Sequence, residues 1–419
     1  MMLFRLAWRN LGRNKRRTAL TTAAGVFATV LSMVNLSVAS GSHERWIDHA
    51  VRLYPGHLEV SLAGYREYRT LDYAMPLDPP TRSALDSVAA ADPRLAAAGW
   101  APRLEAFGLI SADTEQASGR AVQLFGLDGA REVRLSKLVG SIEAGRMAAR
   151  ADGAREITLG TLLARNLGVA IGDPVIVVSA DAFGSQSADR FEVVGTFRVG
   201  NDELDGFGAL VDLADLQAFL EAGDAVSHVA VFLPESSAVP AVEARLDSLF
   251  PADRFEVLPW QELIPDMVQF MVLDDVGNWV GNSVLIVVVG FGLLNTILMS
   301  VFERVREFGV MRALGLRPRA VFALVMIESL ELTLLGIAVG FAIGVPLVLW
   351  LSGHPIPLTG EGTRSAIELF DLEPLIVFAL GRDQLVTLPL LLIGVGVLAA
   401  LPPAIRASRG RPVDALRET

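Results

Sequence analysis

The sequence contains no cysteine and only two lysines, Lys15 and Lys137. Without cysteine the chain can form no disulfide, so any part of it outside the cell must be held together by its own core. A nucleotide-binding P-loop needs a lysine directly after a glycine, and neither lysine has that neighbour. The sequence therefore carries no P-loop of its own.

Histidine is also scarce, and its distribution argues against a metal site. The five histidines are scattered and have no close acid-rich cluster beside them: His43, His49, His57, His228 and His354. No Ser-His-Asp arrangement or nucleophile elbow is present either. We therefore expect no catalytic residues, no metal ligands and no enzymatic activity in this chain.

The abundant feature is apolar sequence, with 52% hydrophobic residues and a mean hydropathy of +0.44. Uncharged runs longer than about 18 residues indicate transmembrane helices. Three such runs are Thr18–Ser42, Val276–Phe302 and Gln384–Ile405, and a fourth, Ala320–Leu351, is interrupted only by Glu328 and Glu331. Four spans predict that both termini lie on the same side of a membrane.

Charge is distributed unevenly between the two sides of these spans. Residues 1–17, 303–319 and 406–419 together hold fifteen basic and four acidic residues, whereas the remaining sequence holds 21 basic and 43 acidic residues. Basic residues near helix ends stay in the cytoplasm. We expect a multi-pass protein of the bacterial cytoplasmic (inner) membrane, with cytoplasmic termini and an acidic domain in the periplasm or outside the cell.

The predicted fold class is an α-helical membrane protein with four transmembrane helices plus a large mixed α/β extracytoplasmic domain. The first helix resembles a cleavable signal, but its apolar core is too long, which favours a retained anchor. The expected organisation is an interfacial helix at 1–17, transmembrane helices at 18–40, 276–302, 320–351 and 384–405, an extracytoplasmic domain at 41–275, a cytoplasmic helix at 303–319, an outer loop at 352–383 and a cytoplasmic tail at 406–419. Pro402 and Pro403 are expected to end or kink the last helix.

The extracytoplasmic domain is long enough for two subdomains and mixes two periodicities. Alternation of apolar and polar residues at 56–62 predicts a strand. Further strands are expected as a pair within 106–127 and at 175–179, 191–197 and 228–233, and helices at 81–98, 161–167, 212–220 and 239–249.

Two features stand out in the second half of the chain. Gly336, Gly340 and Gly344 recur every four residues, so they share one helix face and predict close packing against another helix. In the cytoplasmic segment, an apolar stripe recurs at helical spacing, and Gly315 and Pro318 would end that helix. The stripe consists of Val301, Val305, Phe308, Met311 and Leu314. A membrane surface or a cytoplasmic protein could bury it.

The segment Asn295–Gly340, with Glu-Arg-x-Arg-Glu-x-Gly-x-x-Arg-Ala-Leu-Gly at 303–315, resembles the permease domain shared by MacB, FtsX and the lipoprotein-releasing permeases. These are ABC transporters of the type VII, or mechanotransmission, class. The beginning of the chain at 6–18 and its ending at 403–417 resemble the same family.

The resemblance implies a dimer of permease chains, homomeric or heteromeric, that works with a cytoplasmic pair of ABC ATPase subunits. ATP and magnesium would be bound by those ATPase subunits, with no cofactor in this chain. A periplasmic chaperone or adaptor is left open as a further partner, and nucleic acid is not expected. Carried over from the family, the ATPase-coupling residues are Glu303, Arg304, Arg306, Glu307, Phe308, Met311, Arg312 and Gly315.

Acidic side chains inside a membrane are costly, and Glu328 and Glu331 share one face of the third helix. A structural role beside arginines is favoured over a role in proton coupling. The leading functional hypothesis is a permease subunit that moves lipoprotein or another lipid-linked substrate. The alternatives are an FtsX-like mechanotransmitter that regulates an extracytoplasmic enzyme, and a membrane receptor without transport activity.

Overall fold

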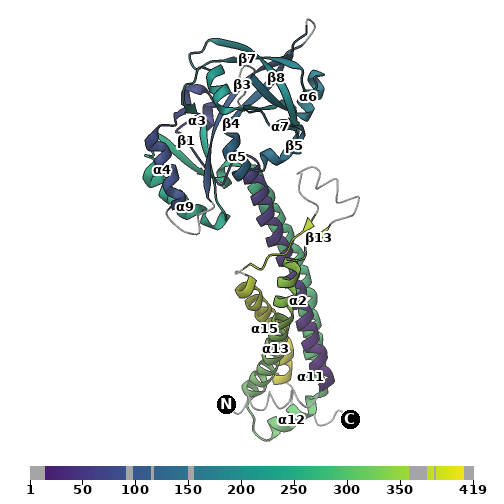
Figure 1. Cartoon of the computed structure of the whole chain (residues 1–419). Helices are drawn as coiled ribbons and strands as arrows, with labels where there is room; N and C mark the ends of the chain where they lie inside the picture. Colours follow the sequence, from purple (N-terminus) through teal and green to yellow (C-terminus); the bar gives the residue numbers. More distant parts are fainter. Residues whose placement is uncertain are drawn as a thin grey trace. The chain divides into compact units, whose positions relative to one another are not determined.

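The computed structural model describes residues 15–90, 98–114, 118–149, 155–357, 375–381 and 384–409 (Figure 1). The chain divides into two compact units. We call Met1–Glu44, Phe270–Leu358 and Leu375–Thr419 the helical unit, and Arg45–Gln269 the sheet unit. The interfacial helix expected at 1–17 and the tail beyond Arg409 lie almost entirely outside the described residues.

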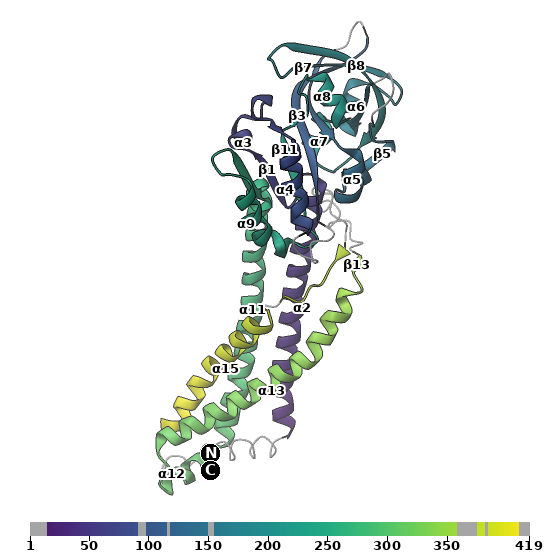
Figure 2. The same ribbon diagram turned by 60° about the vertical axis from the view of Figure 1, so that its left-hand side comes forward.

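The helical unit contains four helices that are long and apolar enough to cross a membrane: α2 (Lys15–Leu53), α11 (Pro265–Glu303), α13 (Pro318–Ser352) and α15 (Gln384–Arg409). The short helix α12 (Val305–Ala313) connects α11 to α13, and a two-stranded ribbon pairs β13 (Ile356–Pro357) with β14 (Leu375–Ile376). Figures 1 and 2 both show α13 beside α15.

Three predicted boundaries differ from the structure. Helix α2 continues to Leu53, and α11 already begins at Pro265, so both overrun the extracytoplasmic boundaries expected at 41 and 275. An apolar run ends where charged residues begin, but the backbone hydrogen bonds of a helix can continue beyond that point. Helix α15 also continues through Pro402 and Pro403 to Arg409, because helices in a membrane protein tolerate proline where neighbouring groups satisfy the freed carbonyls.

Small residues bring α13 close to its neighbours. A Cβ atom added at Gly336 would lie 3.2 Å from the Cα of Gly25 on α2, and one added at Gly340 would lie 2.5 Å from the Cβ of Thr29. A Cβ added at Gly344 would lie 2.9 Å from the sulfur of Met33. The predicted glycine face therefore packs against α2 of the same chain, which is the close backbone approach that small residues permit.

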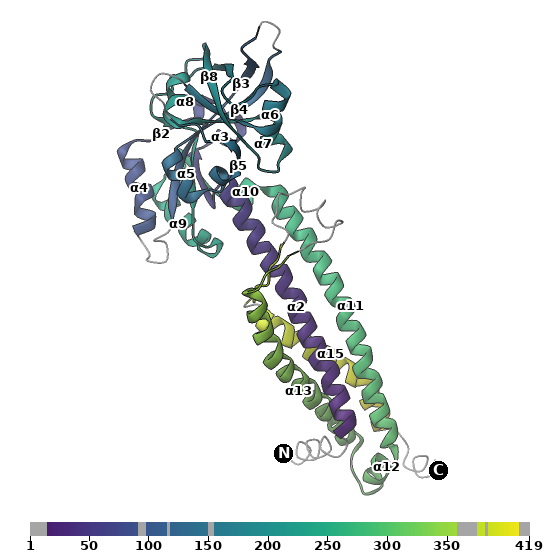
Figure 3. The ribbon, with the colours of Figure 1, turned by 45° about the vertical axis from the view of Figure 1, so that its right-hand side comes forward.

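α2 and α11 are also linked to each other within the helical unit. The imidazole of His43 on α2 lies 2.9 Å from the carboxylate of Asp274 on α11, which also accepts a hydrogen bond from the side chain of Asn278. Figure 3 shows the two helices running alongside one another.

The sheet unit is built on one ten-stranded sheet in the order β12-β1-β11-β3-β4-β9-β6-β8-β5, with β7 pairing with both β3 and β8. The strands are β1 (Leu58–Leu62), β3 (Gly99–Ala112), β4 (Arg120–Leu127), β5 (Ile142–Gly145), β6 (Arg155–Gly160), β7 (Pro174–Ala180), β8 (Gln186–Phe197), β9 (Gly208–Asp212), β11 (His228–Phe232) and β12 (Phe255–Pro259). β2 (Met75–Pro76) and β10 (Ala225–Val226) form a separate pair.

Helices and short turns connect these strands. They are α3 (Tyr65–Tyr68), η1 (Leu71–Tyr73), α4 (Pro79–Ala90), α5 (Gly129–Leu135), η3 (Leu138–Ser141), α6 (Thr161–Leu167), α7 (Asp202–Phe207), α8 (Leu213–Phe219), η4 (Ser236–Ala238), α9 (Val239–Leu249) and α10 (Trp260–Leu263).

Six of the strands, β3, β4, β9, β6, β8 and β7, pair in a closed ring. The ring encloses an apolar core that includes Leu104, Leu124 and Phe191, and α6 and α8 add Leu163 and Leu216 to it. Closure leaves no unpaired strand edge within the ring. The long strand β3 belongs both to the ring and to the antiparallel set β12-β1-β11-β3.

The antiparallel set has two different faces. Val60 of β1 pairs with Val229 of β11 on the face that α4 and α9 cover, and Trp100 of β3 donates a hydrogen bond to Asp86 of α4 there. Figure 2 shows α4 on this side of the strands. The opposite face carries buried polar residues, because side chains alternate along a strand.

Most elements expected in the extracytoplasmic domain are present, including α6 with Gly168 after it at a φ of 69°. The two expected subdomains are not separate, since strands from both halves of residues 45–269 join one sheet in one compact unit. Local periodicity could not show this, because the pairing of β1 with β11 joins residues far apart in the chain.

Candidate coupling site

The candidate site begins where α11 ends. The cytoplasmic helix expected across 301–314 is divided at Arg304, whose φ of −110° and ψ of 10° depart from helical values and which precedes α12 as its N-cap residue. α12 therefore begins in a new direction, and the side chain of Arg304 lies between α11, α12 and α13.

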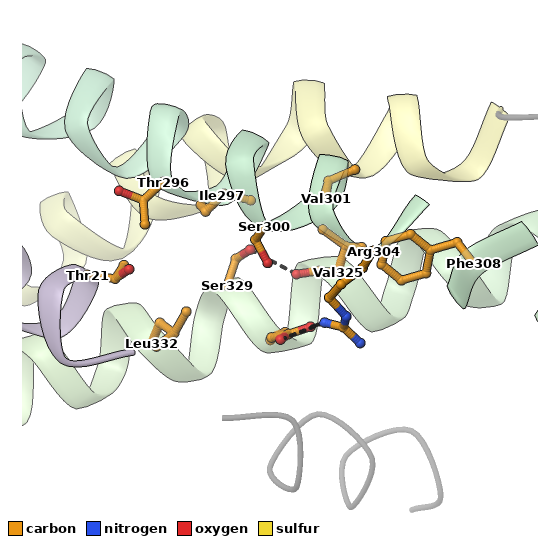
Figure 4. Close-up of a pocket in the computed structure, with 11 residues that line it drawn as sticks. Thr21, Thr296, Ile297, Ser300, Val301, Arg304, Phe308, Val325, Ser329 and Leu332 are labelled. Atoms are coloured by element: carbon orange, nitrogen blue, oxygen red, sulfur yellow. Dashed lines mark hydrogen bonds and ion pairs between the residues drawn. The ribbon is translucent and has the colours of Figure 1, made fainter. Parts of the chain in front are cut away.

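Arg304 is nearly buried and holds these helices together through ionic hydrogen bonds. Its Nη1 donates to both carboxylate oxygens of Glu328 on α13 at 2.9 and 2.8 Å, and its Nε donates to Glu307 on α12 at 2.9 Å. The guanidinium also lies 5.2 Å from the ring centroid of Phe308. Figure 4 shows Arg304 and Phe308 beside the end of α11. Charge-assisted hydrogen bonds of this kind are stronger than neutral ones.

A small cavity of about 20 Å³ lies beside this ion pair, lined by residues that include Thr21, Thr296, Ser300 and Ser329. The hydroxyl of Ser329 donates to the carbonyl of Val325 on its own helix at 2.9 Å (Figure 4). A cavity of this volume has room for about one water molecule. It is too small for a transported substrate.

Part of the apolar stripe of α12 is covered by the chain itself. Phe308 is 4% exposed and packs in a cluster with Val301, Val325 and Ala404, and Met311 packs against the same cluster. A membrane surface or a cytoplasmic protein was expected as the cover of this stripe, but Phe308 is buried by the chain itself. Helices α11, α13 and α15 bury Phe308, because α15 folds back beside the loop. Leu314 of the same stripe remains 83% exposed.

The other face of α12 is open among the described residues. Arg306 is exposed, Val310 is 44% exposed and Leu314 is 83% exposed, and the three are spaced four residues apart. Glu303 is also exposed, whereas Glu307 and Arg312 are half-buried. We call Arg306, Val310 and Leu314 the free face of α12. It combines a cation with two apolar side chains.

Gly315 ends α12 as the sequence indicated. Its φ is 93°, its N–H donates to the carbonyl of Arg312 at 3.0 Å, and the N–H of Leu316 donates to the carbonyl of Met311 at 3.0 Å. This pair of bonds is a Schellman motif. Pro318 follows within the first turn of α13. The turn fixes the direction in which α12 leads into α13.

The two acidic residues of α13 have different surroundings. Glu328 accepts hydrogen bonds from Arg304, and the structural role favoured for it stays a prediction. Glu331 is 8% exposed, and neither of its carboxylate oxygens has a hydrogen-bond partner among the described residues. Among the described residues, no group of three or more histidines and acids is arranged to hold a metal ion.

Comparison with known proteins assigns both units. The family model of the MacB-like periplasmic core domain matches residues 18–249, and the model of the FtsX-like permease C-terminal domain matches residues 279–412, which includes α12 and both partners of the Arg304–Glu328 pair. The chain belongs to the MacB- and FtsX-like family of ABC transporter permeases.

The chain is similar to several individual proteins. A lipoprotein-releasing system transmembrane protein LolC from Xylella fastidiosa is 26% identical over 79% of this chain and 80% of that protein. A macrolide export ATP-binding/permease protein MacB from Chlorobaculum tepidum is 32% identical over 30% of this chain and 16% of that protein. The crystal structure of the periplasmic region of MacB from Actinobacillus actinomycetemcomitans covers 51% of this chain and 94% of that chain, with 11% identity and a TM-score of 0.34.

The permease is thus of the LolC and MacB type, as the motif at 303–315 indicated. Its four apolar helices and its relatives indicate an inner membrane protein with a periplasmic domain. The assignment of single residues to ATPase coupling stays a prediction.

Proposed function

We propose that this permease binds a separate cytoplasmic ATPase through the free face of α12 and transmits the movement of that ATPase to its own periplasmic domain. The termini and α12 lie in the cytoplasm in this proposal, in line with the basic residues near them. A second permease chain completes a dimer, and ATP and magnesium are bound by the ATPase subunits.

One observation supports this proposal above others. α12 exposes Arg306, Val310 and Leu314 on one side, while on its other side Phe308 is packed among α11, α13 and α15 and Arg304 is bound to α13. A partner that moves α12 therefore displaces three apolar helices at once. A loop connected to these helices only through its backbone would bend and leave the helices in place.

Lipoprotein or another lipid-linked molecule is the substrate class we propose. The support is the name of the LolC relative, a lipoprotein-releasing system transmembrane protein that matches most of this chain. The cavity at the candidate site holds only about 20 Å³, which is too small for a lipid-linked substrate.

The second candidate is an FtsX-like mechanotransmitter, which the match at residues 279–412 favours. Both functions use the same ATPase contact, so substrate release distinguishes them. A transporter should release a labelled lipoprotein from proteoliposomes when ATP is added, whereas a mechanotransmitter should leave the lipoprotein in place.

The ATPase contact is tested with Val310→Asp combined with Leu314→Asp. These changes alter exposed side chains and leave the buried Phe308 cluster in place. We expect co-purification with the ATPase and stimulation of its activity to fall at least tenfold, because burying two unpaired carboxylates in an apolar contact is unfavourable, as is typical of interface hot spots. Val133→Asp in the sheet unit, at a side chain 65% exposed, is the control.

Complex formation and ATPase stimulation that survive the double change would show that α12 is not the contact. A membrane receptor without transport activity would bind no ATPase in either form. Phe308→Asp is unsuitable for this purpose, since it would disturb the packing of four helices as well as any contact with a partner.

A further inference from the structure

The polar face of the antiparallel strands borders a cavity of about 400 Å³ in the sheet unit. Its floor includes Glu105 of β3 and His228 of β11, and Glu59 of β1 lies beside them. Its walls include the end of α2 at Leu53 and the α10 residue Leu263. Cavities that hold small ligands have volumes of about 300 to 1,000 Å³.

The two acidic residues at the floor already have partners. Both oxygens of Glu59 accept hydrogen bonds from Arg66, at 3.0 and 2.8 Å. Glu105 accepts one bond from the hydroxyl of Tyr54 and another from the hydroxyl of Tyr65 at 3.0 Å. These carboxylates therefore have little capacity left to recruit a cationic ligand.

Burial by itself raises the pKa of Glu105, but the charge of His228, the hydrogen bonds from Tyr54 and Tyr65 and the charge of Arg69 outweigh that effect. The pKa of Glu105 consequently lies below its ordinary value, so the carboxylate stays ionised.

His228 lacks a hydrogen-bond partner although its side chain is only 2% exposed. Its Nε2 lies 3.9 Å from Glu59 and its Nδ1 lies 3.9 Å from Glu105, which is beyond hydrogen-bond distance, and neither nitrogen has another partner among the described residues. Leaving such a group unsatisfied costs about 1–3 kcal/mol. A buried polar group of this kind at a cavity is a signal for a ligand.

Arg69 provides a second donor at the rim. It is exposed, and its backbone has a φ of 47°, in the left-handed region that residues other than glycine seldom occupy. No carboxylate of the described residues forms an ion pair with it, in contrast to Arg66. Arg69 and His228 are thus donors of the lining without a side-chain partner among the described residues, and the exposed carboxylate of Glu203 also lines the cavity.

Apolar side chains make up much of the remaining wall. Leu53, Phe125, Leu204, Leu263 and Ile264 line the cavity from α2, β4, α7 and the residues around α10. A ligand that matches these surfaces carries hydrogen-bond acceptors at one end and an apolar body at the other.

We infer that this cavity binds a small amphiphile with an anionic head group, a carboxylate or phosphate, whose acceptors face Arg69 and His228 and whose apolar body lies against Leu204 and Leu263. Such a ligand would touch the end of α2 and the helix that leads into α11. The inference concerns the sheet unit alone and does not depend on the contact between α12 and an ATPase.

The test uses the full-length protein in an uncharged detergent, titrated calorimetrically with octyl phosphate and corrected with protein-free micelles. We expect saturable binding that weakens at least tenfold in Arg69→Gln, because that change removes the exposed charge without altering the buried floor. Arg165→Gln, at an exposed arginine of α6 outside the cavity, should bind as the unchanged protein does.

Two other compounds distinguish the chemistry. Octylammonium has the same chain with the opposite charge and should bind at least tenfold more weakly, and inorganic phosphate should bind more weakly still because it lacks the apolar body. Equal binding by the unchanged protein and Arg69→Gln would overturn the inference, as would an absence of binding. Preference for octylammonium, or equal affinity for inorganic phosphate, would also overturn it.

Discussion

The two units of this permease bury polar groups in different ways. In the helical unit, apart from the Arg304–Glu328 pair at the end of α11, hydroxyls such as those of Thr29 and Thr333 donate to carbonyls of their own helices, and glycines bring the helices together. In the sheet unit, large charged side chains are buried, and Arg103 is fully enclosed with Glu132. A lipid environment offers no water to unpaired groups, so local hydrogen bonds suit the helices. A sheet can bring together charged residues that are far apart in the sequence.

The largest effect is expected from Glu132→Gln in the sheet unit. Nε of Arg103 donates to Glu132 at 2.9 Å and Nη2 donates at 3.0 Å, and both side chains are 0% exposed. Removing one charge of a buried pair leaves the other uncompensated and costs about 3–5 kcal/mol. Hydrogen exchange of β3 and β11 in the full-length protein should show a lower opening free energy by that amount.

The matching change in the helical unit, Glu328→Gln, should cost less, because Arg304 keeps its bond to Glu307. Equal losses of stability from Glu328→Gln and Glu132→Gln would show that the bond between Arg304 and Glu307 does not compensate for the lost charge. Loss of transport by Glu328→Gln with intact ATPase activity and assembly would instead favour a role of Glu328 in proton coupling. Asp247→Asn, at an exposed acid of α9, controls for the loss of a charge alone.

A smaller loss of stability should appear in the sheet unit when the pH is lowered. Burial lowers the pKa of His57 to about 4, helped by the charge of Arg52, and its Nδ1 accepts a hydrogen bond from the N–H of Leu233 at 3.2 Å. The folded sheet unit therefore binds fewer protons than the unfolded chain between pH 6.5 and 4. Its stability should be complete above pH 6.5 and fall by up to about 3 kcal/mol as the pH drops to 4.

Hydrogen exchange of β1 and β11 at several pH values measures this loss. His57→Gln retains an acceptor for Leu233 and does not titrate, so it should remove this part of the pH dependence. An unchanged slope in that variant would assign the pH dependence to other groups.

The smallest effect is expected where a glycine of the helical unit is enlarged. Gly340→Val would place a side chain against Thr29, where even a Cβ atom comes within 2.5 Å, and such overpacking costs about 1–3 kcal/mol. The thermal unfolding midpoint in detergent should fall. Gly394→Val on α15 is a matched control, since no described atom outside the backbone of its own helix lies within 4 Å of its added Cβ. An equal change of the unfolding midpoint in both variants would mean that only the helix propensity of the new residue matters, and not its packing against Thr29.

Sequence patterns were informative wherever the cause of the structure is local. The apolar runs, the glycine face of α13 and the Gly315 end of α12 depend on residues a few positions apart. Periodicity showed that Phe308 and Met311 share a face of α12 but could not show that α15 covers it. Ala404 of α15, which packs in the same cluster as Phe308, lies far from it in the sequence.

The floor of the cavity could not be predicted for the same reason. Glu59, Glu105 and His228 become neighbours only because β1, β11 and β3 pair, and the histidines had appeared scattered. The one available signal was a charged residue at an inward position of a strand, as in the alternating segment 56–62, where Glu59 lies between Leu58 and Val60.

The end of α12 at Gly315 bears on the order in which the chain assembles during synthesis. Apart from its chain neighbours, no described residue has a heavy atom within 4 Å of a Cβ added there, and the corner between α12 and α13 is held by its own backbone bonds. It can form as soon as Leu316 has left the ribosome. Ala400 and Ala404 are made much later, and until then one side of Phe308 has no cover. We therefore expect the nascent permease to expose an aromatic side chain that the finished one hides.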